Sequence, residues 1–359
     1  MNKSNFRRLL LDWYEQHKRD LPWRNSTNPY QIWLSEIILQ QTRVNQGLPY
    51  YHKFIDTYPT VKELAEAPIE KVLKTWEGLG YYSRARNLHA TAQYIYYELA
   101  GVFPTTHKDV LLLKGIGDYT AAAICSFAYQ QAHAVVDGNV YRFLSRYLGI
   151  STAINTGAGK KEFSAIAETL LDKKQPDLHN QAIMEFGALQ CSAQKPSCET
   201  CPFKNSCVAL IQNKVMDYPV KNKKSYNKVR HLHFSIITYN YEVIIEQRTE
   251  KDIWHLLFQF PLLEAPTPML AAQWQDELSS DYIDKEKDLK IYSAPPHKLS
   301  HQTIHCHFTL LILPSKSNRP SLKNHQTWCS VEQLKNFAFP KPIRAYIDSN
   351  SSTFAPHLD

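Results

Sequence analysis

Four cysteines that lie within 17 residues constrain this 359-residue chain more than any other feature of its sequence. Their spacing is C-x6-C-x2-C-x5-C, at Cys191, Cys198, Cys201 and Cys207. Four thiolates so close together form a compact tetrahedral ligand set, which suits either a structural zinc ion or a cubane iron–sulfur cluster. The spacing leaves both open. Because four of the seven cysteines crowd into this loop, a disulfide framework is not expected.

The periodicity of apolar residues divides the chain into two domains joined by a linker. Over residues 1–215, apolar residues recur three and four apart between short proline breaks, which predicts an all-α domain that includes the cysteine loop 191–207. Residues 216–228 lack an apolar face and carry four lysines, which is typical of a solvated linker. A length of 359 residues also exceeds that of one typical domain.

The C-terminal residues 229–359 follow a different pattern, with short apolar segments in place of long helical ones. Strands are predicted at 231–237, 243–245 and 304–312, and helices at 269–279 and 331–337. We therefore predict an α+β domain after the linker.

The net charge of +7 is concentrated in the first domain and the linker. Residues 1–215 hold 24 basic and 19 acidic residues, residues 216–228 hold four and one, and residues 229–359 hold 13 and 14. This modest basic excess is compatible with nucleic-acid binding, but many enzymes share it. No apolar run reaches 18 residues and the N-terminus resembles no signal peptide, so we expect a cytoplasmic protein without a membrane partner.

A pair of glycines separates two apolar helical stretches within residues 113–123. Gly115 and Gly117 let backbone N–H groups approach a phosphate, and the N-terminus of the following helix favours an anion. This is the helix-hairpin-helix pattern of sequence-independent DNA binding. A plain turn at the end of a helix explains the same glycines equally well.

Two carboxylates occupy positions that invite a catalytic interpretation. Glu36 interrupts an apolar helix, and burial there would raise its pKa until it holds a proton near neutral pH, as a general acid requires. A glutamate that is hydrogen-bonded in the core, or that faces solvent, is the alternative. Asp137 precedes a predicted helix at 141–148, where an N-cap is the simplest interpretation. The residues alone leave both questions open.

These motifs together resemble the MutY family of adenine DNA glycosylases, within the helix-hairpin-helix superfamily that includes endonuclease III. The resemblance spans about residues 6–210. Besides the cysteine loop and the hairpin, it rests on V-D-G-N-V at 136–140 and on the segments 21–24, 29–44 and 76–88. It implies a 4Fe–4S cluster on the four cysteines.

The resemblance also implies roles for individual residues. Glu36 would protonate N7 of the flipped adenine, and Asp137 would stabilise the oxocarbenium-like sugar. Tyr119 and Asn139 would complete the catalytic site, and Arg24 would contact the extruded adenine. Bifunctional lyases related to endonuclease III carry a lysine at the position of Tyr119. Without that amine, we expect hydrolytic base removal without efficient strand cleavage.

A flipped base leaves a gap in the duplex that other residues must fill. Gln41 and Tyr81 match family residues that intrude on the 8-oxoguanine side of the mispair, and Leu79 lies beside Tyr81 in the chain. Core packing is the alternative for the paired aromatic residues Tyr81 and Tyr82. Arg84, Arg86 and Lys114 are candidates for phosphate contacts.

The C-terminal residues 229–359 resemble the Nudix-like domain of the same family, which checks for 8-oxoguanine. Leu299 stands where family members often have phenylalanine, which reduces the intercalating bulk, while Ser300 can still hydrogen-bond the lesion base. Three histidines at 301, 305 and 307 alternate on one strand face, and we expect them to be ordinary strand residues because no complete ligand set accompanies them.

The sequence thus predicts a monomeric, monofunctional adenine DNA glycosylase. Its predicted substrate is adenine opposite 8-oxoguanine or guanine in duplex DNA. An endonuclease-III-like lyase for oxidised pyrimidines is the alternative of the same fold, disfavoured by Tyr119 and by the second domain. A non-catalytic DNA-binding protein that carries a cluster or zinc is the alternative of another class, disfavoured by the joint presence of Glu36 and Asp137.

Overall fold

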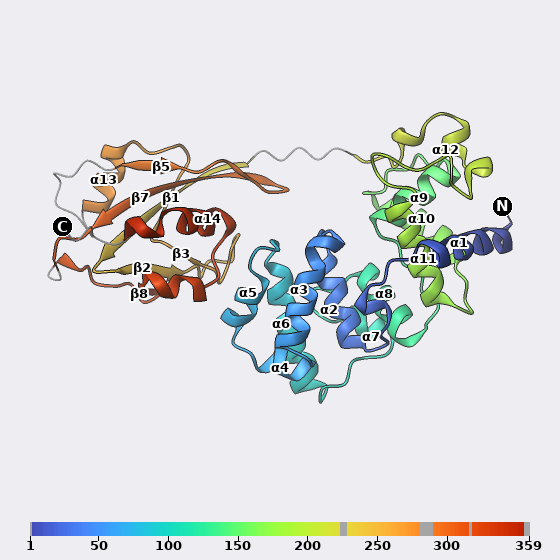
Figure 1. Cartoon of the computed structure of the whole chain (residues 1–359), viewed down its shortest axis with the longest axis horizontal. Coiled ribbons are helices and arrows are strands. Elements are labelled where there is room, and N and C mark those ends of the chain that lie inside the picture. The colour runs from blue at the N-terminus through green and yellow to red at the C-terminus, as the bar shows by residue number, and fades with distance from the viewer. Residues whose placement is uncertain (1, 223–227, 280–289, 316–317, 355–359) are drawn as a thin grey trace. The chain divides into compact units, whose positions relative to one another are not determined.

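The chain forms two compact units (Figure 1). The computed structural model describes residues 2–222, 228–279, 290–315 and 318–354. The first unit, called the helical unit here, comprises residues 1–66 and 87–224, and the second, called the sheet unit, comprises residues 67–86 and 225–359. The segment 67–86, which the sequence pattern placed in the first domain, thus groups with the C-terminal residues.

The helical unit contains helices and, among its described residues, no strand, as the sequence predicted. Its α-helices are α1 (Lys3–His17), α2 (Pro29–Leu39), α3 (Val44–Thr57), α4 (Val61–Glu66), α7 (His107–Leu111), α8 (Asp118–Tyr129), α9 (Gly138–Leu148), α10 (Gly157–Leu170), α11 (Pro176–Leu189) and α12 (Val208–Ile211). Helix α6 (Ser83–Gln93) crosses from the sheet unit into the helical unit.

Local sequence explains where these helices begin. The side chains of Asn2, Asn28 and Thr156 accept backbone N–H groups in the first turns of α1, α2 and α10. Proline occupies the first position of α2 and of α11, where its missing N–H costs no hydrogen bond.

An aromatic cluster joins the N-terminal helix to the cysteine loop. Phe6 of α1, Phe143 of α9, Phe186 of α11 and Phe203 of the loop are all almost fully buried. Ring centroids lie 5.2 Å apart for Phe6 and Phe203 and 4.5 Å apart for Phe143 and Phe186. Each such ring contributes about 1.5–3 kcal/mol by leaving water. The loop is therefore packed onto the core of the helical unit.

The sheet unit is built around one sheet of eight strands with the order β3-β2-β1-β7-β5; β4 also pairs with β1, β6 with β7 and β8 with β2. The strands are β1 (Lys228–Tyr239), β2 (Glu242–Gln247), β3 (Phe258–Gln259), β4 (Leu262–Ala265), β5 (Ile291–Ser293), β6 (His297–Lys298), β7 (Gln302–Ile312) and β8 (Gln326–Ser330). The central pair, β1 and β7, is parallel, with Lys228 opposite Gln302 and Thr238 opposite Ile312. The three strands predicted from the sequence fall within β1, β2 and β7.

Helices α5 (Ile69–Trp76), α13 (Ala271–Ser279) and α14 (Lys341–Asn350) belong to the sheet unit. The predicted helix at 269–279 corresponds to α13, whereas the one at 331–337 is a 3₁₀ helix, Val331–Asn336, that begins with a capping box at Ser330. The resulting α+β architecture confirms the predicted fold class.

The predicted linker packs partly against the helical unit. The carbonyl oxygen of Val220 accepts the N–H of Ile154, and the backbone of Asn222 exchanges hydrogen bonds with the side chain of Asn155. The described linker residues 216–222 are exposed or half-buried, and some of their backbone groups find partners on the helical unit. Residues 223–227 lie outside the described residues. No described helix is long and apolar enough to cross a membrane.

Candidate active site and cysteine loop

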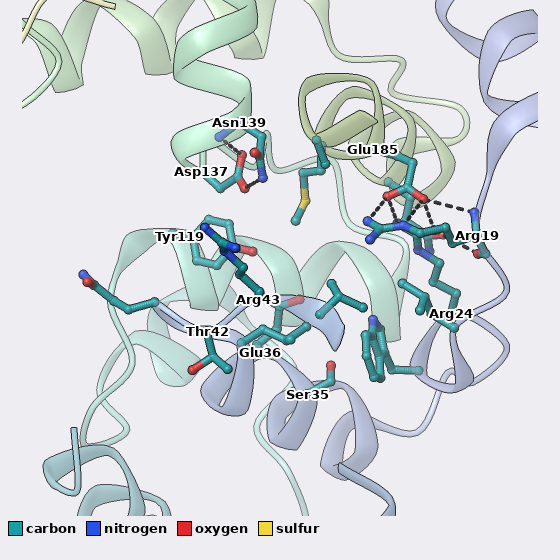
Figure 2. Close-up of a pocket in the computed structure, with 18 of the residues that line it drawn as sticks. Arg19, Arg24, Ser35, Glu36, Thr42, Arg43, Tyr119, Asp137, Asn139 and Glu185 are labelled. Carbon is teal, nitrogen blue, oxygen red and sulfur yellow. Dashed lines mark hydrogen bonds and ion pairs between the residues drawn. The ribbon is translucent and has the colours of Figure 1, made fainter. Parts of the chain in front are cut away.

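A cavity of about 830 Å³ opens among α2, α8 and α11 in the helical unit. Figure 2 shows Glu36 on α2, Tyr119 on α8, Asp137 and Asn139 at the start of α9, and Glu185 on α11 around this space. Arg24 and Gln41, two predicted DNA-contacting residues, also line it. Glu36 and Glu185, which are 149 positions apart in the sequence, thus line the same cavity.

Glu36 is the buried acid of this cavity. Its side chain has 6% of its surface exposed, on a helix whose neighbouring residues are almost all buried. Burial raises its pKa from 4.5 to about 7, against a hydrogen bond from Tyr119 and the charge of Arg24, while the Asp137 charge adds to the rise. At neutral pH a large share of Glu36 therefore carries a proton that it can donate.

Tyr119 stands beside Glu36 in the first turn of α8 and is hydrogen-bonded to it. Burial raises the pKa of the Tyr119 phenol well above its usual 10, and the two neighbouring carboxylates raise it further. The hydroxyl group therefore remains a neutral hydrogen-bond donor. It offers no amine to the cavity.

Asp137 is both the N-cap of α9 and a lining residue of the cavity. One carboxylate oxygen accepts the backbone N–H groups of Asn139 (2.9 Å) and Val140 (2.8 Å), and the other accepts the Asn139 side-chain amide (2.6 Å). Burial raises the pKa of Asp137, and these hydrogen bonds oppose the rise. The N-cap interpretation is thus confirmed, and it fixes the carboxylate in place at the cavity wall.

Arg24 reaches the cavity as part of a charged triad that the sequence did not reveal. Glu185, 1% exposed, receives two hydrogen bonds from Arg24 (3.0 and 2.8 Å) and two from the Arg19 side chain (2.8 and 2.6 Å). Burial would raise the pKa of Glu185, but the hydrogen bonds from Arg19 and Arg24 outweigh it and hold the pKa at about 2. A signal was present, since Glu185 interrupts the apolar run of α11 as Glu36 interrupts that of α2.

Gly187 allows α11 to approach the start of α9. A Cβ atom there would lie 2.6 Å from the carbonyl oxygen of Asn139, a distance that no real side chain adopts. A larger residue at this position would push Asn139, and with it the carboxylate of Asp137, out of place. Sequence inspection overlooked this glycine.

The hairpin between α7 and α8 has one glycine that its geometry demands. Gly115 has φ +81°, and a Cβ atom there would lie 2.8 Å from Cβ of Asn87. Gly117 caps α8 with φ −108° and has open space around it. Because Leu113 and Ile116 are buried, the hairpin is anchored, while Lys114 faces solvent.

The four cysteines line one small cavity, of about 30 Å³, together with Phe143, Phe186 and Phe203. Backbone N–H groups point at two of the sulfurs: that of Phe203 at Cys201, and those of Leu210 and Ala209 at Cys207. Burial raises the pKa of the Cys201 thiol to about 12 and raises those of Cys198 and Cys207. Four sulfur donors, apolar walls and N–H groups directed at sulfur fit an iron–sulfur cluster.

Within the described part of the chain, no group of three or more His, Cys, Asp or Glu side chains is arranged to hold a metal ion. The four thiols converge on one cavity without forming such a group.

Two arginines of α9 bind the cysteine loop, and one of them, Arg142, also lines the cavity. Arg142 donates to the carbonyl oxygen of Cys191 (2.8 Å) and to the side-chain oxygen of Asn139 (2.9 Å), which in turn donates to Asp137. Arg146, 2% exposed, donates to the Cys191 sulfur (3.5 Å) and to the carbonyl of Ser192 (2.7 Å). Sequence analysis missed both residues, although arginines four apart on a buried helix are an available signal.

Comparison with known proteins places these features in a family. Residues 34–171 match the HhH-GPD superfamily base excision DNA repair proteins, and residues 233–349 match the NUDIX domain. An adenine DNA glycosylase from Buchnera aphidicola (subsp. Acyrthosiphon pisum) is 33% identical over 350 residues, which are 97% of this chain and 98% of that protein. The chain belongs to the adenine DNA glycosylase family.

Other relatives each match a little more than half of this chain. The human adenine DNA glycosylase is 42% identical over 213 residues, 57% of this chain and 39% of the human protein. The structure of a thermostable thymine-DNA glycosylase matches with a TM-score of 0.55 at 30% identity, over 58% of this chain and 97% of that one. A non-covalent endonuclease III–DNA complex matches with a TM-score of 0.52 at 19% identity, which shows a common fold.

The residues predicted to face the lesion are divided between the two units. Gln41 lines it, exposed and with φ +59° just after α2. Tyr81 is 50% exposed and Leu79 is 6% exposed, and both lie in the sheet unit. Ser300 is exposed and Leu299 is half-buried, in the turn between β6 and β7 of the same unit. Their roles in this family member remain predictions.

The histidines of β7 form a stack with those of β1. His305 lies opposite His231 and His307 opposite His233 in the parallel pairing, with ring centroids 4.7 and 4.6 Å apart for the pairs His231–His305 and His233–His307. Burial lowers the pKa of His307 to about 4 and also lowers those of His231 and His233. His231, His233 and His307 are therefore neutral at neutral pH.

Proposed function

We propose that this chain hydrolyses the N-glycosidic bond of adenine in duplex DNA, and that it prefers adenine opposite 8-oxoguanine or guanine. The observation that carries the proposal is the pairing of a buried acid, Glu36, with an ordered carboxylate, Asp137, across one cavity in an adenine DNA glycosylase family member. Cleavage of such a bond needs a proton donor for the leaving base and a negative charge for the sugar cation.

The first chemical step uses Glu36 as the acid. Its proton passes to a ring nitrogen of adenine, N7 by resemblance to the family, while the C1′–N9 bond breaks and its electron pair leaves with the base. The Glu36 pKa of about 7 makes the proton both available and transferable near neutral pH. Tyr119 supports the carboxyl group by its hydrogen bond.

The second step is the capture of the sugar cation by water. Asp137 holds a fixed carboxylate toward it, since three hydrogen bonds restrain that group. Water adds to C1′ and loses its proton to the Glu36 carboxylate, which restores the starting acid. Because Tyr119 replaces an amine, no Schiff base forms and the product is an intact abasic strand.

A stacked base cannot reach this cavity, so adenine must leave the helix at a cost of a few kcal/mol. The cavity of about 830 Å³ has room for the extruded base. Arg43 and Lys195 lie along its wall and supply positive charge for the flanking phosphates. Gln41, Leu79 and Tyr81 contact the DNA strand opposite the excised adenine. Leu299 and Ser300 contact the lesion base in that strand.

We further propose that Cys191, Cys198, Cys201 and Cys207 hold a 4Fe–4S cluster. A bound cluster supplies a covalent cross-link among the four thiolates, and the loop then presents Lys195 and the Cys191 carbonyl in fixed positions. Purified protein should contain about four irons per chain. Stoichiometric zinc without iron in protein prepared anaerobically would contradict this assignment. We place the enzyme as a monomer in the cytoplasm, on chromosomal DNA.

The decisive experiment is single-turnover incubation with duplexes that carry adenine opposite 8-oxoguanine, guanine or thymine, each analysed with and without alkali. We expect excision at the first two and almost none at the third, with strand breaks that appear after alkali only. Efficient borohydride trapping would support the endonuclease-III-like lyase. Tight binding without excision on any duplex would support the non-catalytic alternative.

A further inference from the structure

The turn that carries Tyr81 is held in an unfavourable backbone conformation. Tyr81 has φ +48°, a left-handed value that costs free energy in any residue with a Cβ atom. Such a conformation persists only when the surroundings enforce it. Within the turn, Trp76 donates its indole N–H to the carbonyl of Gly80 (3.0 Å), and the Arg84 guanidinium lies over the Tyr81 ring at 5.6 Å.

Residues near the C-terminal helix α14 of the sheet unit bind Glu77, the residue at which this turn begins. Glu77, which ends α5, accepts the backbone N–H of Phe339 (2.9 Å) and the Nε–H of Arg344 (3.1 Å), and it also pairs with Lys74. Its side chain is 16% exposed, so these contacts are shielded from solvent. Lys74 in turn donates to the carbonyl of Phe337 (3.2 Å).

Arg344 restrains Glu77 through further hydrogen bonds of its own. On α14, it donates to the carbonyls of Leu334 (3.1 Å) and Phe337 (2.7 Å), and its guanidinium lies 5.0 Å from the Phe339 ring. One planar guanidinium therefore fixes the chain before α14 and the carboxylate of Glu77 together. Beyond the turn, Arg86 donates to the carbonyl of His255 (2.9 Å), so the segment is tied to the C-terminal residues at both ends.

We infer that Glu77 is a positioning residue through which the C-terminal domain sets the conformation of the Tyr81 turn, and thereby the rate of adenine excision. The inference rests on the proposed function only for the role of Tyr81. It gives the C-terminal domain a second task besides contact with the lesion base. A misplacement of about 1 Å in a residue remote from the chemistry can cost roughly 10²-fold in rate, so the grip is worth testing kinetically.

The kinetic test compares full-length variants in single-turnover excision of adenine opposite 8-oxoguanine. Glu77→Ala removes every contact of the carboxylate, whereas the amide oxygen of Glu77→Gln can still accept the Phe339 N–H. We expect a fall of roughly tenfold for alanine and a smaller fall for glutamine, by analogy with coupled residues in contact. Glu70→Ala is the matched control, because Glu70 lies exposed on the same helix with one weak contact, at 3.4 Å, to Gln247.

A double-mutant cycle then tests whether Glu77 acts through Tyr81. In the Tyr81→Ala background, Glu77→Ala should slow excision less than about twofold, because the residue it positions is gone. A fully additive effect would overturn the inference, since a merely structural role lowers the rate equally in both backgrounds.

Hydrogen–deuterium exchange of the peptide that spans residues 77–82 tests the grip without any activity. Uptake should rise in Glu77→Ala and in Arg344→Ala, and should stay at the wild-type level in Glu70→Ala. Unchanged uptake in folded Glu77→Ala protein would overturn the inference even if the enzyme excises adenine as proposed. If the wild type excises no adenine, the proposed function fails, and the exchange experiment still decides whether Glu77 holds the turn.

Discussion

Two buried glutamates line the same cavity, and they differ in charge because they differ in partners. Glu36 on α2 faces a phenol and another carboxylate, and its pKa rises to about 7. Glu185 on α11 is even less exposed, yet two arginines hold its pKa at about 2. Burial alone therefore makes neither a catalytic acid nor a structural anion. Glu36 on one wall of the cavity is a proton donor, and Glu185 on the other wall is an anion that orients Arg24.

The largest expected effect is that of Glu36→Gln. Loss of the proton donor should lower single-turnover excision by about 10³-fold, within the range for a positioned general acid. Duplex affinity should change little, because it depends mainly on phosphate contacts. Rapid-quench kinetics and a binding titration with a non-cleavable duplex measure the two separately. A variant that excises adenine at the wild-type rate would end the assignment of Glu36 as the acid.

The same variant has a pH signature in stability. The pKa of Glu36 in the folded protein lies above its ordinary value of 4.5. The contribution of this carboxyl group to the stability of the fold is therefore complete below pH 4.5 and is lost as the pH rises through about 7. Glu36→Gln should therefore melt at a higher temperature than wild type above pH 7, with the difference shrinking toward pH 5. Thermal melts across this range provide the measurement, and a constant difference would show that the carboxyl group does not titrate there.

Asp137→Asn should come next. Removal of the charge that faces the sugar cation is expected to slow excision by about 10²–10³-fold. The weakened N-cap should cost about 1 kcal/mol of stability and lower the melting temperature slightly. Combined melts and single-turnover rates separate the two roles of this residue, because an N-cap alone would leave the folded protein fully active.

For Glu185→Gln the main effect should fall on stability. The change leaves two arginines without their carboxylate, at a cost of about 3 kcal/mol, the lower end of the range for a broken buried pair because Arg19 reaches solvent. Since the folded pKa is depressed to about 2, this loss should be constant between pH 5 and 8 and disappear only as the pH falls toward 2. Chemical denaturation at several pH values tests this contrast with Glu36.

The smallest effect is expected for Tyr119→Phe. Its hydroxyl lowers the pKa of Glu36 by hydrogen bonding, so removal of that group should raise this pKa. Excision needs protonated Glu36 and declines as the pH rises; in the variant the decline should begin at higher pH, with a loss of less than about tenfold at the optimum. A pH–rate profile that does not move would show that the hydrogen bond has no influence on the acid.

The sequence predicted those parts of the site that depend on short motifs. Asp137 and Asn139 lie within one five-residue motif, and Glu36 stands out because the helix around it is apolar. Glu185 also interrupts an apolar helix, but its ion pairs could not be predicted, because Arg19 and Arg24 lie 166 and 161 positions away. Ion pairs over such separations leave no periodic trace in the chain.

The boundaries of the two units were also hard to predict from the sequence, because they depend on contacts between residues far apart in the chain. Residues 67–86 have the helical pattern of the first domain, and only contacts such as that of Glu77 with Arg344, 267 positions apart, join them to the sheet unit. Arg84 and Arg86 are candidates for phosphate contacts. In the structure, Arg84 is buried over the Trp76 ring, and the half-buried Arg86 donates to the His255 carbonyl. The sequence did not reveal these packing partners, and the phosphate contacts stay predictions.

The contact between Phe6 and Phe203 has a consequence for how the chain is made. During synthesis, helix α1 leaves the ribosome before the cysteine loop, so Phe6 lacks its Phe203 partner until almost 200 more residues have been made. Closure of so long a segment is slow, and the exposed phenylalanine is available to chaperones in the meantime. The aromatic core of the helical unit is therefore complete only after the loop that holds the four thiols has been synthesised.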